Sequence, residues 1–156
     1  MKYSVRKAKD TDGEAMLALL PRLAAFEIPD SRTAEHLWVH DAALMRDWIE
    51  GNTDNVLMHI AEDEAGTVVG VAMVTLRPEL LSHEPSAHLE AIAVSDDVEG
   101  QGIGQLLLQA VEDDATAHGA KTITLHVFAS NKRARGFYER SGYDGELMRY
   151  IKPIKS

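Results

Sequence analysis

The chain has 156 residues, a formal net charge of −9 at pH 7 and no cysteine, and 45% of its residues are hydrophobic. This composition fits one globular domain over residues 1–156, and it excludes disulfides, a thiol nucleophile and thiolate metal sites. The negative charge argues against a nucleic-acid partner, since phosphate backbones attract clustered basic residues, and it is compatible with a cationic amine substrate.

No stretch approaches the ~20 apolar residues that a membrane-spanning helix needs. The N-terminus lacks the apolar run of a signal peptide. We therefore expect a cytoplasmic protein that has no membrane partner.

Hydrophobic periodicity divides the first half of the chain into a strand, two helices and a hairpin. Thr11 and Glu14 have capping-box spacing and predict a helix start, and Pro21 predicts that this helix weakens or kinks. In chain order the expected elements are strand 3–8, a helix from residue 11, helix 33–50 capped by Gly51, and strands 56–61 and 67–76 around a turn at 64–66.

The second half predicts a crossover unit, in which two strands flank one amphipathic helix and therefore run parallel. The expected elements are strand 88–94, helix 102–118, strand 122–128, helix 131–141 and one last strand, or two short ones, over 143–152. The core face of the first of these helices is expected to be Ile103, Leu106, Leu107, Ala110 and Val111. The fold class is thus α/β, with a mixed sheet covered by helices on both faces and the order β-α-α-β-β-β-α-β-α-β.

Three glycines at alternate positions, Gly100, Gly102 and Gly104, lie between the strand 88–94 and the following helix. Glycine permits positive φ and close approach of the backbone to a ligand, and free amides at a helix start attract anions. The turn therefore predicts a phosphate or pyrophosphate cradle, and the alternative is a tight turn with no ligand. A P-loop is excluded because no Gly-Lys-Ser/Thr follows, and the late position disfavours a Rossmann turn.

A second motif follows one strand later, and the two motifs together resemble those of the Gcn5-related N-acetyltransferase (GNAT) superfamily. That family's loop reads Arg/Gln-x-x-Gly-x-Gly/Ala, and its later motif reads Asn-x-x-Ala-x-x-Phe-Tyr-x-x-x-Gly-Phe/Tyr. The chain matches the later motif at Asn131, Ala134, Phe137, Tyr138, Gly142 and Tyr143. The element order also agrees, so the resemblance covers essentially the whole chain.

The resemblance implies that acetyl-CoA binds in a V-shaped gap between strands 88–94 and 122–128, and it implies no metal. Pyrophosphate would lie on the loop amides, and the pantetheine arm would pair with the backbone of the first strand. The residues assigned to these contacts are Ile92, Val94, Glu99, Gly100, Gln101, Gly102, Ile103 and Gly104. Asn131 would contact pantetheine, and the basic cluster Lys132, Arg133 and Arg135 would suit the 3′-phosphate, although a solvated helix face is an equal reading of each one.

The resemblance assigns Tyr138 as the general acid that protonates the leaving thiolate. Phe137 and Tyr138 lie ~100° apart on a helix, so we expect Phe137 in the core. Glu90 and His88 lie two apart on one strand and therefore face one side. Glu90 is the first candidate for the base that deprotonates the amine and His88 the second, while the family also contains members with no single base.

One position departs from the family pattern, because Glu99 stands where Arg or Gln is usual. We expect Glu99 to turn outward to solvent, so that a nearby carboxylate weakens the pyrophosphate site without abolishing it.

The sequence thus predicts an acetyl-CoA-dependent N-acetyltransferase that acts on a small-molecule primary amine by direct attack in a ternary complex. Acetylation of a protein N-terminus or lysine is a variant of this hypothesis. A non-catalytic acyl-CoA-binding or sensor module is the rival from another class. Dimers are common in the family, so a homodimer is the assembly that the resemblance implies.

Overall fold

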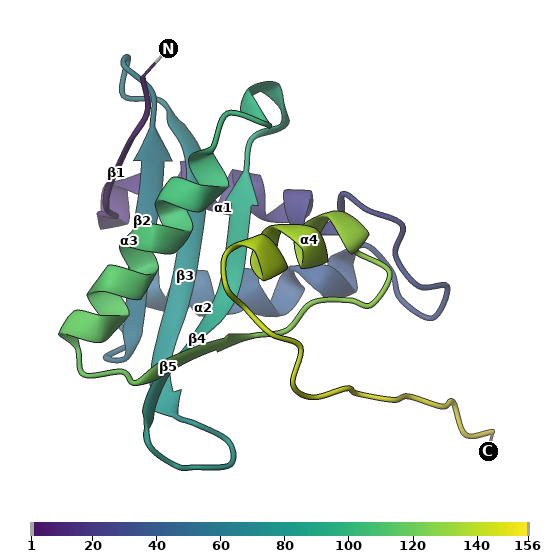
Figure 1. Cartoon of the computed structure of the whole chain (residues 1–156). Helices are drawn as coiled ribbons and strands as arrows, with labels where there is room; N and C mark the ends of the chain where they lie inside the picture. Colours follow the sequence, from purple (N-terminus) through teal and green to yellow (C-terminus); the bar gives the residue numbers. More distant parts are fainter. Residues whose placement is uncertain (1, 156) are drawn as a thin grey trace.

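The computed structural model of the protein describes residues 2–155. Its centre is a five-stranded sheet in the order β1-β2-β3-β4-β5, with each strand beside the next in sequence (Figure 1). The strands are β1 (Ser4–Lys7), β2 (Val56–Glu62), β3 (Val68–Pro78), β4 (Pro85–Val94) and β5 (Thr122–Leu125). The first four strands pair antiparallel, and β5 runs parallel to β4, as the crossover predicts.

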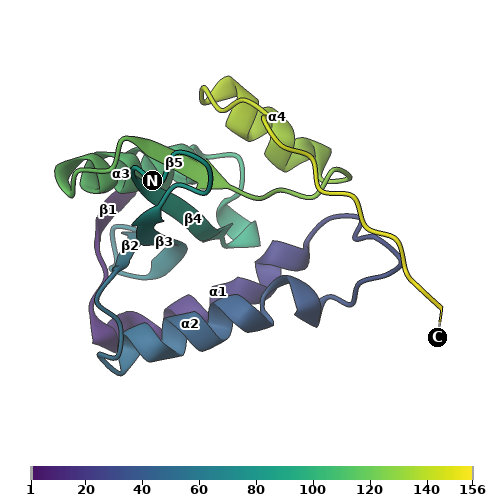
Figure 2. The same ribbon diagram turned by 90° about the horizontal axis from the view of Figure 1, so that it is seen from below.

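Helices cover both faces of this sheet (Figure 2). One layer holds α1 (Gly13–Leu19) and α2 (Val39–Ile49), and the other holds α3 (Ile103–Ala117) and α4 (Lys132–Arg140). Short 3-10 turns are η1 (Asp10–Asp12), η2 (Leu20–Ala24), η3 (Glu35–Leu37) and η4 (Asp96–Val98). The α/β class with a mixed sheet is confirmed.

Each face has its own apolar core. On the α1 and α2 side, the fully buried Met16, Met45 and Met73 belong to one cluster. On the α3 side, Leu107, Leu108 and other α3 residues pack against the opposite surface of the sheet. The predicted α3 face was wrong at Leu106, which is 45% exposed, while the unpredicted Leu108 is fully buried.

The edge strand β5 separates from its neighbour β4 where the site is expected. The parallel register joins Ser86–Leu89 to Thr122–Leu125 and then ends, although β4 continues to Val94. At the same point the register of β4 with β3 shifts, because Leu89 and Ala91 have Cα partners on β3 and Glu90 has none. A bulge of this kind bends a strand and increases its twist. Beyond Leu89 the β5-facing edge of β4 therefore has no partner strand in the described chain.

Several predicted boundaries were wrong, and the last strand is the largest error. Residues 143–155 form neither helix nor strand, and the chain after Tyr143 runs exposed away from the sheet (Figure 1). The predicted helix 33–50 is helical as α2 only from Val39, because Trp38 adopts φ −140° and interrupts it after η3. The helix predicted from Thr11 begins with η1, and the capping bond joins the Lys9 amide to Asp12 at 2.8 Å instead of joining Thr11 to Glu14.

Pro21 has the predicted effect, since α1 ends at Leu19 and tightens into the 3-10 turn η2. Within residues 2–155, no helix is both long and apolar enough to cross a bilayer.

The close packing of α3 on β3 generates a first prediction. A Cβ at Gly70 would lie 2.9 Å from Leu107 Cδ1 and 3.2 Å from Ile103 Cγ2, both buried side chains that have little room to move. Gly70→Val should therefore lower the free energy of unfolding by about 1–3 kcal/mol in urea titrations, through overpacking.

Gly145→Val is the matched control, because a Cβ at Gly145 meets nothing within 4 Å. We expect that variant to change stability by less than about 0.5 kcal/mol. Equal stabilities for the two variants would contradict the packing argument.

Candidate functional site

The predicted glycine turn forms an open loop at the start of α3. Gly100 and Gly102 have φ of 78° and 80°, and Gly102 is the left-handed residue that precedes the first helical residue. A Cβ at either position would meet nothing within 4 Å, so the loop surface is free for a ligand. Gly104 instead faces α4, where an added Cβ would lie 3.4 Å from Phe137 Cζ.

This loop has the chemistry of an anion cradle. The first amides of an α-helix lack intrahelical acceptors, and the helix dipole adds partial positive charge there. Five consecutive residues around the α3 N-terminus are expected to contribute these amides: Gly100, Gln101, Gly102, Ile103 and Gly104. Ile103 has its side chain in the core, and Gln101 Oε1 accepts the Tyr3 hydroxyl at 3.0 Å. A pyrophosphate fits this open backbone turn.

The end of β4 lies beside the loop and borders the parting of the strands. The side chains of Ile92 and Val94 pack toward the α3 core, which leaves their backbone for any contact along the gap. One backbone acceptor is already used, because Arg22 Nε donates to the Val94 carbonyl at 3.2 Å.

Glu99 is exposed, as expected, but its carboxylate does not point freely into solvent. Its side chain is 36% exposed, but its Oε1 forms ion pairs with Arg22 of η2 and with Arg133 Nη1 at 3.3 Å. No local pattern could have indicated Arg22, because it lies 77 positions earlier on another element.

The basic residues of α4 do not act together. Arg133 pairs with Glu99, whereas Arg135 Nη1 donates to the Ala129 carbonyl at 3.0 Å. Asn131 is the N-cap of α4, with its Oδ1 accepting the Ala134 amide at 3.2 Å. This bond orients the amide group of Asn131 and explains why the motif begins with asparagine.

Tyr138 lies between two aromatic rings on α4 and the following turn. Its ring centroid is 5.3 Å from that of Phe137 and 5.8 Å from that of Tyr143, and all three rings pack against the α3-side core. Burial raises the pKa of Tyr138 to about 12, so its proton is retained at neutral pH. Its hydroxyl makes no hydrogen bond with any residue of the described chain, whereas the Tyr143 hydroxyl donates to Glu112 Oε2 at 2.6 Å.

Glu90 and His88 face the α2 side of the sheet, as their spacing predicts. Glu90 Oε2 accepts the Thr75 hydroxyl at 2.6 Å and lies 3.9 Å from Arg77 Nη2. His88 Nδ1 lies 2.8 Å from Thr124 Oγ1, and its ring centroid is 4.8 Å from that of His126. The two candidate bases thus occupy one polar row beside the point where β4 and β5 part.

The pKa of His88 is lowered to about 4, mainly because burial penalises the charged imidazole. Arg77 and His126 lower it further, and Glu90 opposes them. At neutral pH His88 is therefore uncharged and able to accept a proton.

A second carboxylate, Asp41, lies in this region and was not predicted. Burial, together with the charge of Glu90, raises the pKa of Asp41 on α2 to about 6. A signal was present, because Asp41 lies three residues after Trp38 and four before Met45 and so shares their apolar stripe. A carboxylate on such a stripe indicates a polar environment in the core.

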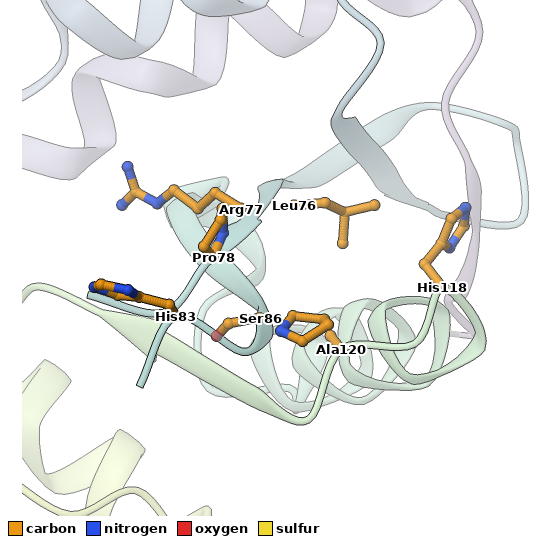
Figure 3. A pocket seen from close by; sticks show the side chains of 8 residues that line it. Leu76, Arg77, Pro78, His83, Ser86, His118 and Ala120 are labelled. Carbon is orange, nitrogen blue, oxygen red and sulfur yellow. The ribbon is translucent and has the colours of Figure 1, made fainter. Parts of the chain in front are cut away.

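A separate pocket of about 310 Å³ lies at the far end of the sheet (Figure 3). His83 and His118 line it from opposite sides, and their imidazoles do not converge. His118 follows the last residue of α3, about 22 Å from the glycine loop at 1.5 Å per residue. Within the described chain, no three His, Asp or Glu side chains group as a metal site would require.

Comparisons with known proteins agree on one family. A model of the acetyltransferase (GNAT) family matches residues 21–143 of the chain. An uncharacterized N-acetyltransferase of Bacillus subtilis, YhfO, is 29% identical over 143 residues, which cover 90% of this chain and 89% of that protein. The mycothiol acetyltransferase of Propionibacterium freudenreichii is 32% identical over 100 residues, which cover 64% of this chain and only 30% of that protein.

A solved structure shares the whole fold. The structure of AAC(6')-Iy in complex with the bisubstrate analogue CoA-S-monomethyl-acetylneamine matches with a TM-score of 0.75. The match covers 99% of this chain and 100% of that one, at 19% sequence identity. At this identity the likeness concerns the fold.

The environment of His88 generates a prediction with a defined sign. In an NMR titration its imidazole should remain neutral at pH 6 and protonate near pH 4. Arg77→Gln should raise this midpoint by removing a positive charge, and Glu90→Gln should lower it further. A midpoint near 6.5, or shifts of the same sign in both variants, would contradict the assigned causes.

The same shift predicts how stability depends on pH. Between about pH 6.5 and pH 4 the unfolded chain binds a proton at His88 and the folded protein does not. The His88 contribution to the free energy of unfolding is therefore complete above this window and is lost as pH falls through it.

Proposed function

The chain belongs to the acetyltransferase (GNAT) family, and on this premise we propose that it transfers the acetyl group of acetyl-CoA to a primary amine. Transfer would occur by direct attack in a ternary complex, within a single domain over residues 1–156. The observation that carries this proposal is the parting of β4 and β5 at Leu89, directly beside an open glycine loop.

The loop and the strand edge together suit coenzyme A. The amides of Gly100–Gly104 would hold the pyrophosphate, and the free edge of β4 near Ile92–Val94 would hold the pantetheine arm. The solved structure of AAC(6')-Iy, which shares the fold and contains a CoA bisubstrate analogue, supports CoA as the ligand. When bound, acetyl-CoA supplies the thioester carbon for attack and a thiolate leaving group.

A protonated amine must lose a proton before it can attack. With an ordinary pKa near ~10.4, that loss costs about 4–5 kcal/mol at pH 7. Glu90 is our first candidate to accept the proton, since Thr75 bonds only one of its carboxylate oxygens. His88 is the second candidate, because it lies on the same strand face as Glu90 and is uncharged at neutral pH. Asp41 and Glu90 would also favour a cationic acceptor.

Tyr138 is our candidate for the acid that protonates the leaving thiolate. Its raised pKa keeps it protonated at neutral pH, and its hydroxyl has no competing partner in the described chain. A tyrosine that served only packing would be expected to have a bonded hydroxyl, as Tyr143 has.

Thiol release from acetyl-CoA, measured against a panel of amines, tests the proposed function. The panel should contain small primary amines, diamines, aminoglycosides and peptides with free N-termini or lysines. Amine-dependent release supports the transferase, and the preferred class separates small-molecule from protein acceptors. CoA binding without release for any amine would favour the alternative, a non-catalytic acyl-CoA sensor.

Tyr138→Phe should lower kcat by about 10²-fold while the Kd for CoA changes little, because the hydroxyl would act only in the transition state. Tyr150→Phe is the matched control, since that tyrosine is 85% exposed on the tail and its loss should leave kcat unchanged. Equal kcat values for Tyr138→Phe and the unsubstituted protein would assign Tyr138 to packing.

We also propose a homodimer, supported by the exposed tail. The tail carries five large apolar side chains that are at least 60% exposed, namely Leu147, Met148, Tyr150, Ile151 and Ile154. Within residues 2–155 the edge strand β5 pairs only with β4, so its outer edge is available to an extended segment of a second copy.

Light scattering should therefore give the mass of a dimer, and Leu147→Glu with Ile151→Glu should give a monomer. Lys152→Glu is the control, because it also adds negative charge to the tail but removes no large apolar side chain. A monomeric unsubstituted protein, or a dimer that survives both apolar replacements, would contradict the proposal.

A further inference from the structure

Glu99 connects two elements that lie on opposite sides of the gap between β4 and β5. Its Oε1 forms ion pairs with Arg22 on η2 and with Arg133 on α4. The same two sides also meet where Ser130 Oγ donates to the Glu27 carbonyl at 3.0 Å. A carboxylate held between two guanidinium groups thus spans the mouth of the proposed site.

The position of this carboxylate is significant because it adjoins the anion cradle. Glu99 directly precedes Gly100, so its two arginines lie beside the amides that would hold a pyrophosphate. A guanidinium binds phosphate and carboxylate oxygens by the same charge-assisted, fork-like hydrogen bonds. Glu99 therefore satisfies both arginines with the kind of contact that a phosphate would offer.

Exchange of one anion for another at this position is energetically easy. The ion pair is partly exposed, with side-chain exposures of 28% for Arg22 and 36% for Glu99, and exposed ion pairs typically contribute ~0–1 kcal/mol. A pyrophosphate diester carries two negative charges and can also bond the loop amides. It would thus offer the two arginines more negative charge than the single carboxylate does.

Arg22 also links this cluster to the strand edge. Its Nε donates to the carbonyl of Val94, the last residue of β4, while its Nη2 contacts Glu99. The guanidinium therefore lies across the path from the strand edge to the glycine loop. A ligand that occupies both must contact Arg22 or displace it.

We propose that Arg22 and Arg133 form a two-armed clamp for a pyrophosphate diester, and that Glu99 occupies the clamp in the free protein until the ligand replaces it. The inference rests on the proposed function in taking CoA as the ligand. It adds Arg22 as a binding residue and makes Glu99 an internal competitor of the ligand.

Calorimetric titration with CoA at two ionic strengths tests the clamp. Arg22→Gln should weaken binding by roughly 10-fold or more, through loss of a hydrogen bond to a charged phosphate. Glu99→Gln should tighten binding several-fold at low salt, and the gain should shrink as salt rises. In the double variant the gain from Glu99→Gln should shrink, because Glu99 then competes with the ligand only for Arg133.

Two matched controls separate the clamp from general charge effects. Arg46→Gln removes an exposed arginine of α2 that has no ion pair in the described chain, and Glu139→Gln removes an exposed carboxylate of α4. Both should leave the Kd within about twofold. Melting curves of every variant without ligand confirm that each one folds.

Two further ligands identify the bound group. Dephospho-CoA lacks the 3′-phosphate. Arg22→Gln should weaken its binding by the same factor as it weakens the binding of CoA. Inorganic pyrophosphate should compete with CoA, and more strongly in Glu99→Gln. A loss that vanishes with dephospho-CoA, an unchanged Kd in Arg22→Gln, or weaker binding in Glu99→Gln would overturn the clamp.

The clamp and the proposed function can fail separately. If CoA binds with the expected variant pattern and no amine is acetylated, the clamp stands and the transferase fails. If amines are acetylated and Arg22→Gln binds CoA as tightly as the unsubstituted protein, the transferase stands and the clamp fails.

Discussion

The loss of hydrogen bonding between β4 and β5 after Leu89 is the constraint on which the rest of the site depends. A parallel pair that continued to Val94 would satisfy the backbone of both strands and close the sheet. Instead, the bulge at Glu90 bends β4, and β5 ends at Leu125. The resulting free strand edge is a set of unsatisfied backbone groups that an extended ligand arm can complete.

The second requirement is a rigid base for the loop at the end of that edge. The helix α3 packs closely on β3 through Gly70, so its N-terminus is held at a fixed position against the sheet. Phe137 of α4 packs against Gly104 in the first turn of α3 and fixes α4 beside it. The glycine loop and the α4 motif, which are separate in sequence, are therefore in direct contact through Gly104 and Phe137. The proposed acid on α4 packs on the α3 side of the sheet, and the proposed bases on β4 face the α2 side.

Much of this could be predicted from the sequence, because the strongest signals are local. The periodicity of α3, the glycines with positive φ and the parallel crossover all depend on residues close in the chain. The cap at Asn131 was also recognisable as the start of a motif. Errors arose where tertiary contacts decide, as at Leu106, which is exposed, and at Trp38, which interrupts the helix predicted over 33–50. The strand predicted after Tyr143 has suitable residues, but it lacks a partner in the described chain.

In the candidate site, too, local features could be predicted and tertiary contacts could not. The spacing of His88 and Glu90 predicted their common face, whereas the partners of Glu99 come from elements 77 and 34 positions away in sequence and could not be read locally. The sequence places the carboxylate of Asp41 on an apolar helix stripe. Its electrostatic interaction with Glu90, however, depends on the packing of α2 on the sheet.

The central claim is that one opening, between the parted strands and the glycine loop, holds the acyl carrier. Backbone amide NMR during a CoA titration tests it most directly. We expect the largest shifts at Ala91–Val94 and Gly100–Gly104, with little change at the far pocket lined by His83 and His118. Shifts that centre on that pocket, and leave the loop amides unchanged, would contradict the account.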